Sequence, residues 1–307
     1  MTRLDRIVIA LVLFGLFAAI SGQFSSVTFD PSVGRRPLPD ESQTPPSSVA
    51  PEPSPERVGR PLPAAGPGDP LFSVDVEDIP SNMIEIGTSF PVADGVWLTA
   101  RHVANDECDR LTLSVNGHNI SAKISYLHPD ADLAVIQTRA APEADLQISD
   151  EPLREDQTGF SFGYPHGRLG ATADRVMGRA RMRLAGHLSG VGPVVAWAEI
   201  GRYPADLDTI QGMSGGPMFD GDGKVIGVIV AASVRRGRNY TVAPEIIRAA
   251  QQDVPLLASA GHRAPVAEIA GKTVVLDRVA NALAANSRIA KTYCVPADDA
   301  IKIVPRS

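Results

Sequence analysis

The chain has 307 residues, a formal net charge of −6 and 44% apolar residues, which is enough for one or two folded domains. The acidic balance argues against a general nucleic-acid role, because binding to phosphates needs a basic surface. No phosphate-binding loop of the Walker or dinucleotide type occurs. We therefore expect no nucleic-acid partner, no metal and no cofactor.

Residues 1–23 form the first segment. An unbroken apolar run from Ile7 to Ile20 follows Arg3 and Arg6. The run is shorter than the roughly 20 residues of a full membrane span and is typical of a signal-peptide core, although a short anchor is equally compatible. Both interpretations place the N-terminus in the cytoplasm and predict that the rest of the chain is exported.

Residues 24–71 form the second segment and contain twelve of the 26 prolines. The segment has few aromatic residues and no apolar periodicity, so we expect a disordered, extended linker. Val33–Pro39 and Val58–Pro63 repeat one basic proline-rich pattern. The repeat suits either a plain spacer or a polyproline II ligand.

Residues 72–255 change character, because short β-rich runs now alternate with turn residues. The runs are Met83–Val92, Gly95–Leu98, Leu111–Val115, Ile120–Leu127, Leu133–Gln137, Val194–Ile200, Val225–Ala232 and Tyr240–Val242. They predict an all-β domain, with enough chain for two six-stranded antiparallel β-barrels and a cleft between them. A short helix at Pro244–Gln251 ends this domain.

Residues 256–307 form a tail of about 50 residues. It has a candidate strand at Lys272–Leu276, helical spacing over Val279–Ala290 and a last apolar run at Ile301–Val304. We expect an extension that docks on the barrels.

The most informative motif is Gly212-Met213-Ser214-Gly215-Gly216-Pro217. It places a serine on a glycine-rich turn, where the N–H groups of Gly212 and Ser214 can point at one spot and hold an oxyanion. A serine is a weak nucleophile by itself and needs a general base and a group that orients the base.

Both partners occur upstream. His102 follows an apolar strand in the sequence Thr99-Ala100-Arg101-His102, and Asp132 lies directly before a short apolar run. The order histidine, aspartate, serine is that of a chymotrypsin-type catalytic triad. Asp130 competes with Asp132, but it lies in a polar turn after Pro129, so Asp132 is favoured.

The serine motif also fits the nucleophile elbow of α/β-hydrolases, in which a helix follows the serine. Here Gly-Gly-Pro follows Ser214 and resists helix formation. Residues 218–223 then give a hairpin signal. A strand, a turn and a second strand are therefore expected, which argues against the elbow.

The blocks T-A-R-H, D-L-A-V-I and G-M-S-G-G-P resemble the three catalytic blocks of trypsin-like serine proteases. The short spacings, together with Gly163–Gly167 and Asp222–Val228, resemble the compact bacterial HtrA-like branch, over about residues 72–250. The resemblance implies a chymotrypsin-like fold and endopeptidase activity. The tail is too short for the PDZ domain that this branch often carries.

Within this resemblance, Met213 stands where zymogens of the family carry an aspartate that pairs with a new N-terminus. We expect no activation by that kind of cleavage, and the oxyanion site is either preformed or switched by loop ordering. The resemblance implies a substrate pocket with Asp208 and a wall formed by Ala231, Ala232 and Ser233. Asp208 favours basic side chains, whereas Asp206 and the small wall residues favour aliphatic ones.

The two cysteines, Cys108 and Cys294, are compatible with a disulfide in an exported protein, or with two buried thiols. The cluster Arg235-Arg236-Gly237-Arg238 indicates an exposed hairpin tip, or a contact with acidic substrates or lipid headgroups. His128, Asp130 and Asp132 are metal-ligand types, but without a fourth partner they do not predict a metal site.

The sequence thus predicts an exported, periplasmic serine endopeptidase that acts on protein or peptide substrates and is tethered to the inner membrane if residues 1–23 remain attached. Two other classes stay open. A non-peptide acyl hydrolase would use the same triad on esters. A non-catalytic peptide-binding sensor would have the protease fold without the activity.

Overall fold

The computed structural model describes residues 59–76, 85–139, 146–186, 190–254 and 275–296. The predicted signal peptide or anchor and most of the predicted linker lie outside these residues, as does the last apolar run at 301–304. Within the described ranges, no helix is long and apolar enough to cross a bilayer.

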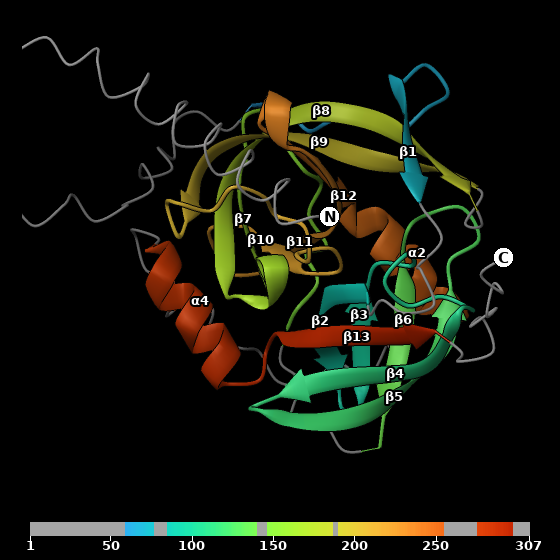
Figure 1. Ribbon diagram of the computed structural model, residues 1–307. Helices are drawn as coiled ribbons and strands as arrows, with labels where there is room; N and C mark the ends of the chain where they lie inside the picture. Colours follow the sequence, from blue (N-terminus) through green and yellow to red (C-terminus); the bar gives the residue numbers. More distant parts are fainter. Residues whose placement is uncertain (1–58, 77–84, 140–145, 187–189, 255–274, 297–307) are drawn as a thin grey trace, which may run out of the picture. The chain divides into compact units, whose positions relative to one another are not determined.

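The prediction of an all-β fold is confirmed (Figure 1). The strands are β1 (Leu71–Val76), β2 (Glu85–Ala93), β3 (Val96–Thr99), β4 (Cys108–Val115), β5 (His118–Leu127), β6 (Ala134–Thr138), β7 (Thr158–Gly163), β8 (Gly170–Gly186), β9 (Gly190–Tyr203), β10 (Pro217–Phe219), β11 (Val225–Ser233), β12 (Arg238–Val242) and β13 (Ala290–Pro296). The helices among the described residues are α2 (Pro244–Asp253), α4 (Leu276–Ala285) and the 3-10 turns η3 (Pro165–Gly167) and η4 (Val234–Arg236).

The first barrel is closed and antiparallel, with the strand order β13-β2-β3-β6-β5-β4. Trp97, Leu113 and Ile136 are fully buried in one of its apolar clusters. The closing strand β13 comes from the far end of the chain and lies between β2 and β4, where Thr292 is opposite both Gly87 and Leu113. The segment that sequence analysis assigned to a docked extension therefore contains an integral strand of this barrel.

The second sheet has seven strands, in the order β1-β8-β7-β10-β11-β12-β9, with a further pairing between β8 and β9. Because β9 pairs back to β8, six of these strands form a closed ring of antiparallel pairs. The seventh, β1, adds to β8 in parallel and was not expected. The long strand β8 also had no counterpart in the sequence prediction, whereas β9 extends the predicted run Val194–Ile200 at both ends.

The last part of the predicted linker contacts the second barrel. Gly59 N–H donates to the Glu155 carbonyl at 2.9 Å, and Leu62 N–H donates to the Leu153 carbonyl at 2.7 Å. The side chain of Leu62 is buried in the same apolar cluster as Trp197. Residues 59–71 thus lie against the folded domain, which differs from the extended linker expected there.

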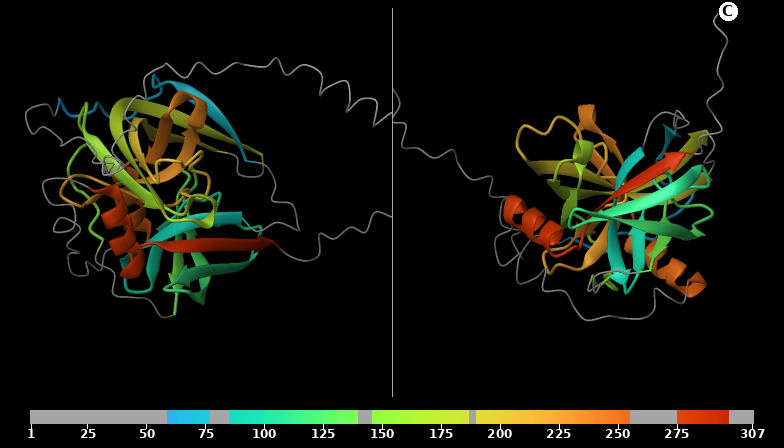
Figure 2. Two further views of the ribbon diagram at one scale, coloured as in Figure 1. Left: turned by 60° about the vertical axis from the view of Figure 1, so that its left-hand side comes forward. Right: turned by 60° about the horizontal axis from the view of Figure 1, so that its bottom comes forward.

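The two barrels share one apolar core. Phe90 and Leu98 of the first barrel belong to the same buried cluster as Phe162 and Phe219 of the second, and Leu283 of α4 joins them. Figures 1 and 2 show α4 alongside β7 and β8, which it contacts. Burial of this shared surface is the main force that holds the barrels together.

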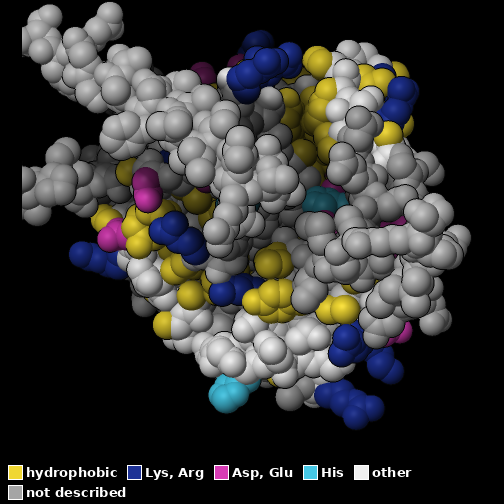
Figure 3. All heavy atoms as spheres, in the orientation of Figure 1, with side chains coloured by type: hydrophobic (Ala, Val, Ile, Leu, Met, Phe, Trp, Pro, Cys, Tyr) yellow, Lys and Arg dark blue, Asp and Glu magenta, His cyan; other side chains and the backbone are white. Residues whose placement is uncertain are grey.

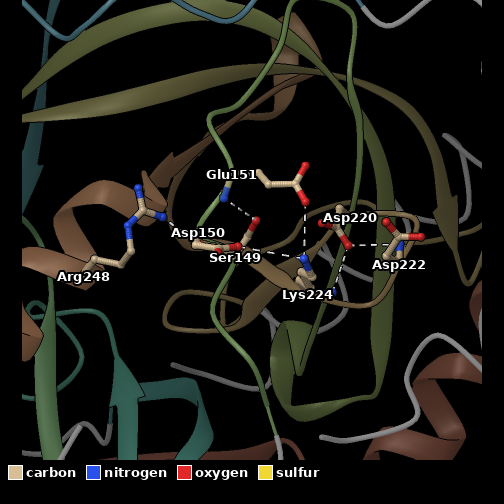
Figure 4. A network of polar contacts seen from close by, with 7 residues as sticks. All are labelled: Ser149, Asp150, Glu151, Asp220, Asp222, Lys224 and Arg248. Carbon is tan, nitrogen blue, oxygen red and sulfur yellow. Dashed lines mark hydrogen bonds and ion pairs between the residues drawn. The ribbon is translucent and has the colours of Figure 1, made fainter. Parts of the chain in front are cut away.

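A polar network fixes the connection between the barrels (Figure 4). Lys224 Nζ lies 3.4 Å from Glu151 Oε1 and 3.9 Å from Asp150 Oδ1. Ser149 N–H donates to the Val225 carbonyl at 2.8 Å, and Arg248 of α2 donates to the Ser149 carbonyl. The connecting segment 146–151 is thereby held to β11 and α2, on the side of the serine-bearing hairpin.

Candidate active site

His102 lies in the turn that follows β3. Val103 and Ala104 N–H groups donate to the Ala100 carbonyl, which starts a helical turn directly after the strand. Nδ1 of His102 is 2.6 Å from Asp132 Oδ2, and the His102 backbone N–H donates to Asp132 Oδ1 at 2.9 Å. The carboxylate therefore fixes both the ring and the backbone of the histidine.

Asp132 lies just before β6 and its side chain is fully buried. The loop before it is shaped by the His128 ring, whose Nδ1 accepts the N–H groups of Asp130 and Ala131. The competing residue, Asp130, is exposed. Of the two candidate aspartates, Asp132 is the one that contacts His102.

The pKa of His102 is raised to about 9. Burial lowers the pKa, but the charge of Asp132, the hydrogen bond to it and the charge of Glu85 outweigh this effect. With Asp132 accepting from Nδ1–H, the other ring nitrogen is left as the proton acceptor once the ring is neutral. The His102 side chain is 15% exposed, so it remains accessible.

Ser214 is half-buried in a turn that leads directly into β10. A strand, not a helix, follows the serine, so the α/β-hydrolase elbow is ruled out for this site. Gly212 has φ +101° and Gly215 has φ +84°, values that favour glycine. A Cβ on Gly212 would lie 2.6 Å from the Tyr164 carbonyl oxygen, so the turn also needs glycine for space.

Four backbone N–H groups between residues 211 and 216 donate to an acceptor within the protein. Gln211 N–H donates to Thr209 Oγ1, Met213 N–H to the Ile210 carbonyl, Gly215 N–H to the Ile229 carbonyl and Gly216 N–H to the Met213 carbonyl. In the described part of the chain, the N–H groups of Gly212 and Ser214 donate to no protein acceptor. These are the two donors that the sequence pattern indicated.

The serine turn packs directly on the histidine-bearing barrel. Thr88 N–H donates to the Ser214 carbonyl at 2.8 Å. A Cβ on Gly215 would lie 2.2 Å from Thr99 Oγ1 and 2.8 Å from the Ala100 nitrogen, two residues before His102. The serine turn therefore lies at the boundary of the barrels, against the end of the strand that precedes His102, and no hydrogen bond joins Ser214 to His102 among the described residues.

Met213 is fully buried with Trp197 and Met218 in the second barrel. Apolar packing therefore fixes the residue before the serine, a position that is held by an ion pair with the new N-terminus in enzymes activated by cleavage of a zymogen.

The predicted substrate residues lie in two places. Ala231, Ala232 and Ser233 end β11, opposite Tyr240, Asn239 and Arg238 of β12. Asp208 is exposed, between the buried residues Leu207 and Ile210.

The basic cluster predicted at 235–238 forms η4 and the start of β12, which is the hairpin tip expected from the sequence. On the face drawn in Figure 3, Lys and Arg side chains lie in separate groups, one at the upper edge and another at the lower right.

Cys108 and Cys294 form a disulfide, with sulfurs 2.01 Å apart and Cα atoms 5.1 Å apart. The bridge joins the start of β4 to β13. Its first cysteine, Cys108, lies six residues after His102 in the sequence. Within the described ranges, no group of His, Cys, Asp and Glu side chains could hold a metal ion.

Sequence reasoning missed two residues that shape the serine turn. Thr88 on β2 donates through Oγ1 to the Gly212 carbonyl at 2.8 Å. His166 N–H of the loop 163–167 donates to the Gln211 carbonyl at 2.8 Å. The Gly-x-Pro-x-Gly pattern marked that loop, whereas no pattern distinguished Thr88 from other strand residues.

Comparison with known proteins gives a consistent result. Residues 87–228 match the family described as "Trypsin-like peptidase domain". The chain is 27% identical over 194 residues to serine protease Rv3671c of Mycobacterium tuberculosis, covering 63% of this chain and 47% of the relative. It is 31% identical over 175 residues to a probable periplasmic serine endoprotease DegP-like of Bartonella henselae, covering 56% and 33%.

The chain thus spans less than half the length of these curated relatives. Among solved structures, the active form of the Rv3671c protease from M. tuberculosis is similar with a TM-score of 0.45 and 21% identity, covering 69% of this chain and 97% of that one.

Proposed function

Because residues 87–228 match the family of trypsin-like peptidase domains, we propose that the chain is a serine endopeptidase with His102, Asp132 and Ser214 as its catalytic triad. Ser214 Oγ attacks the peptide carbonyl and forms an acyl-enzyme. His102 accepts the proton of Ser214 and later gives it to the leaving amine. Asp132 holds the ring tautomer and stabilises the imidazolium.

The observation that supports this proposal most directly is which backbone N–H groups of the serine turn have no acceptor. Only the N–H groups of Gly212 and Ser214 lack an acceptor among the donors of 211–216 in the described chain. Donors that are fixed before the reaction stabilise the oxyanion without reorganisation, and losing one typically costs about 3 kcal/mol of the barrier. This supports a preformed oxyanion hole over one switched by loop ordering.

The proposed substrate is an extended peptide in an exported protein. Ala231, Ala232 and Ser233 would form the wall of the first specificity pocket, with Asp208 at its entrance. The Bartonella henselae relative is described as periplasmic. Together with the apolar run at 7–20, this favours a periplasmic enzyme, tethered to the inner membrane if that run is kept.

The test is fluorophosphonate labelling of the purified exported portion, mapped by mass spectrometry, with Ser214→Ala and His102→Ala as controls. We expect label on Ser214 that depends on His102. Hydrolysis of a mixed peptide library should follow, and Ser214→Ala should lower kcat by about 10⁴-fold or more.

Labelling together with ester hydrolysis but no peptide hydrolysis would support an acyl hydrolase instead. A folded sample that takes no label and cleaves nothing would contradict the proposal and favour a peptide-binding sensor.

A further inference from the structure

Thr88 uses every hydrogen-bonding atom that it has. Its N–H donates to the Ser214 carbonyl at 2.8 Å, and its carbonyl accepts from Thr99 Oγ1 at 2.8 Å. Its hydroxyl donates to the Gly212 carbonyl at 2.8 Å and accepts from Tyr164 N–H at 3.1 Å. The residue is fully buried on β2, in the first barrel, whereas its partners Ser214, Gly212 and Tyr164 belong to the second.

We propose that the Thr88 hydroxyl is a positioning group that keeps the oxyanion hole formed, by fixing the peptide plane between Gly212 and Met213. This inference rests on the proposed function. It goes beyond the triad, because it assigns part of the oxyanion-hole geometry to a side chain of the opposite barrel.

The argument follows from the planarity of the peptide bond. In a trans peptide the C=O and N–H point in opposite directions, so a bound carbonyl sets the direction of the next N–H. The Gln211 carbonyl accepts from His166 N–H, which sets the Gly212 N–H, and the Met213 carbonyl accepts from Gly216 N–H, which sets the Ser214 N–H. The plane between them is held by Thr88 Oγ1 at the Gly212 carbonyl.

That plane borders a glycine. Gly212 has no Cβ, so the peptides on both sides can rotate at low steric cost. If the Gly212 carbonyl turned away from Thr88, the N–H of Met213 would leave the Ile210 carbonyl, to which it now donates at 2.9 Å. That rotation changes ψ of Gly212 and φ of Met213, so the two planes on either side, which carry the N–H groups of Gly212 and Ser214, would lose their fixed orientation relative to each other.

The same hydroxyl connects the two loops that form the hole. By accepting from Tyr164 N–H it fixes the start of the loop 164–167, and that loop supplies the His166 N–H to Gln211. The residue before Tyr164 has to be small for this contact, because a Cβ on Gly163 would lie 2.7 Å from Thr88 Oγ1.

Two substitutions separate the hydroxyl from the shape of the side chain. Thr88→Val keeps the volume and the backbone N–H to Ser214 but removes the hydroxyl. Thr88→Ser keeps the hydroxyl and removes the methyl group. Thr292→Val is a matched control, because Thr292 is also a fully buried threonine of the first barrel and its hydroxyl pairs with Ser89, away from the serine turn.

We expect Thr88→Val to lower kcat for a peptide substrate by about 10- to 100-fold with KM within about twofold, since the donors act on the transition state. Its affinity for a peptidyl boronate, whose tetrahedral adduct occupies the oxyanion hole, should fall by a similar factor, while a non-covalent product peptide binds unchanged. Thr88→Ser should recover kcat to within about threefold of the parent, and Thr292→Val should keep the parent kcat.

Parent kcat in Thr88→Val would overturn the inference, and so would equal losses in Thr88→Ser and Thr88→Val, which would indicate packing alone. If the folded parent cleaves nothing, the proposed function fails instead. The inference is then decided by a crystal structure of Thr88→Val: a rotated Gly212 carbonyl supports it, and an unchanged one overturns it.

Discussion

The two barrels differ in how they close. The second barrel is built from one continuous stretch, because its six ring strands, from β7 to β12, all lie between residues 158 and 242. The first barrel takes five strands from residues 85–138 and its sixth, β13, from residues 290–296. A disulfide between Cys108 and Cys294 joins this distant strand to the barrel.

This difference shows which contacts the candidate site depends on in each barrel. The first barrel holds His102 and Asp132 in direct contact, so the pair depends on that barrel remaining closed. The second holds the serine turn and the two free donors. Neither barrel carries a complete site, and the contacts of Thr88 and Gly215 join the two halves.

The largest effect is expected from breaking the closing strand. Thr292→Pro would remove a backbone donor in the middle of β13, which pairs on both sides. We expect loss of cooperative unfolding of the first barrel and loss of labelling at Ser214. Ser73→Pro in β1, which pairs with β8 alone, is the control and should leave labelling intact. Equal damage from both changes would show that the barrels do not differ in this way.

Removing the disulfide should have the next largest effect. The bridge spans 186 residues of sequence, and loss of a native disulfide typically costs about 2–5 kcal/mol. The double variant Cys108→Ser, Cys294→Ser should therefore unfold at lower denaturant concentration. Hydrogen exchange should speed up in β13 and β4 more than in β11. Uniform acceleration across both barrels would contradict a local role.

The pH dependence of activity should be set by a group of the first barrel, His102. With the pKa of His102 at about 9, the ring is protonated below that pH and cannot accept the serine proton. We expect kcat/KM of the free enzyme to rise about tenfold per pH unit up to about pH 9 and then level off. Glu85→Gln should move the midpoint downward, because the charge of Glu85 raises the pKa. A midpoint unmoved by this change would rule out that influence.

The smallest effect concerns the interior of the second barrel. Burial raises the pKa of Asp174 to about 7 from 3.8, against hydrogen bonds from Thr172, Asn239 and Ser161 that lower it. Since the folded state holds this proton more tightly than the unfolded state, stability should fall as pH rises from about 4 to 7. Asp174→Asn should remove this loss and be about 1–3 kcal/mol more stable at pH 8.

The measurement is chemical denaturation at pH 5 and pH 8. Parent and variant should have similar midpoints at pH 5 and separate at pH 8. The midpoint of the His102 activity profile should stay unchanged in Asp174→Asn. A variant that is less stable than the parent at pH 8 would contradict the sign of the effect.

Much of the site follows from local patterns. The three candidates were recognisable for different reasons: His102 follows an apolar strand, Asp132 directly precedes an apolar run, and Ser214 lies in a glycine-rich turn. The position of the serine turn against the first barrel could not be deduced from the sequence, because it depends on contacts such as that between Gly215 and Ala100. Thr88 looks like any threonine in a strand until its partners are known.

The strands that escaped prediction have identifiable causes. In β8, Arg179, Arg181 and Arg183 alternate with Ala180, Met182 and Leu184, which is a period of two hidden by good helix formers. In β13 the burial also alternates, but the expected helix over 279–290 ran into its first residue, whereas α4 ends at Ala285. Local propensity cannot reveal that β13 pairs with β4 and β2, which lie about 180 and about 200 residues earlier in the chain.

The order of the strands along the chain has a consequence for synthesis. A ribosome that has released residues 85–242 has supplied everything that the serine-bearing barrel needs for its ring. The histidine-bearing barrel still has an open edge at β2 and β4 until residues 290–296 emerge and pair with both. In the proposed enzyme, catalytic competence therefore arises late in translation, because a nascent or prematurely terminated chain carries the proposed nucleophile while the barrel that holds the proposed proton acceptor is still open.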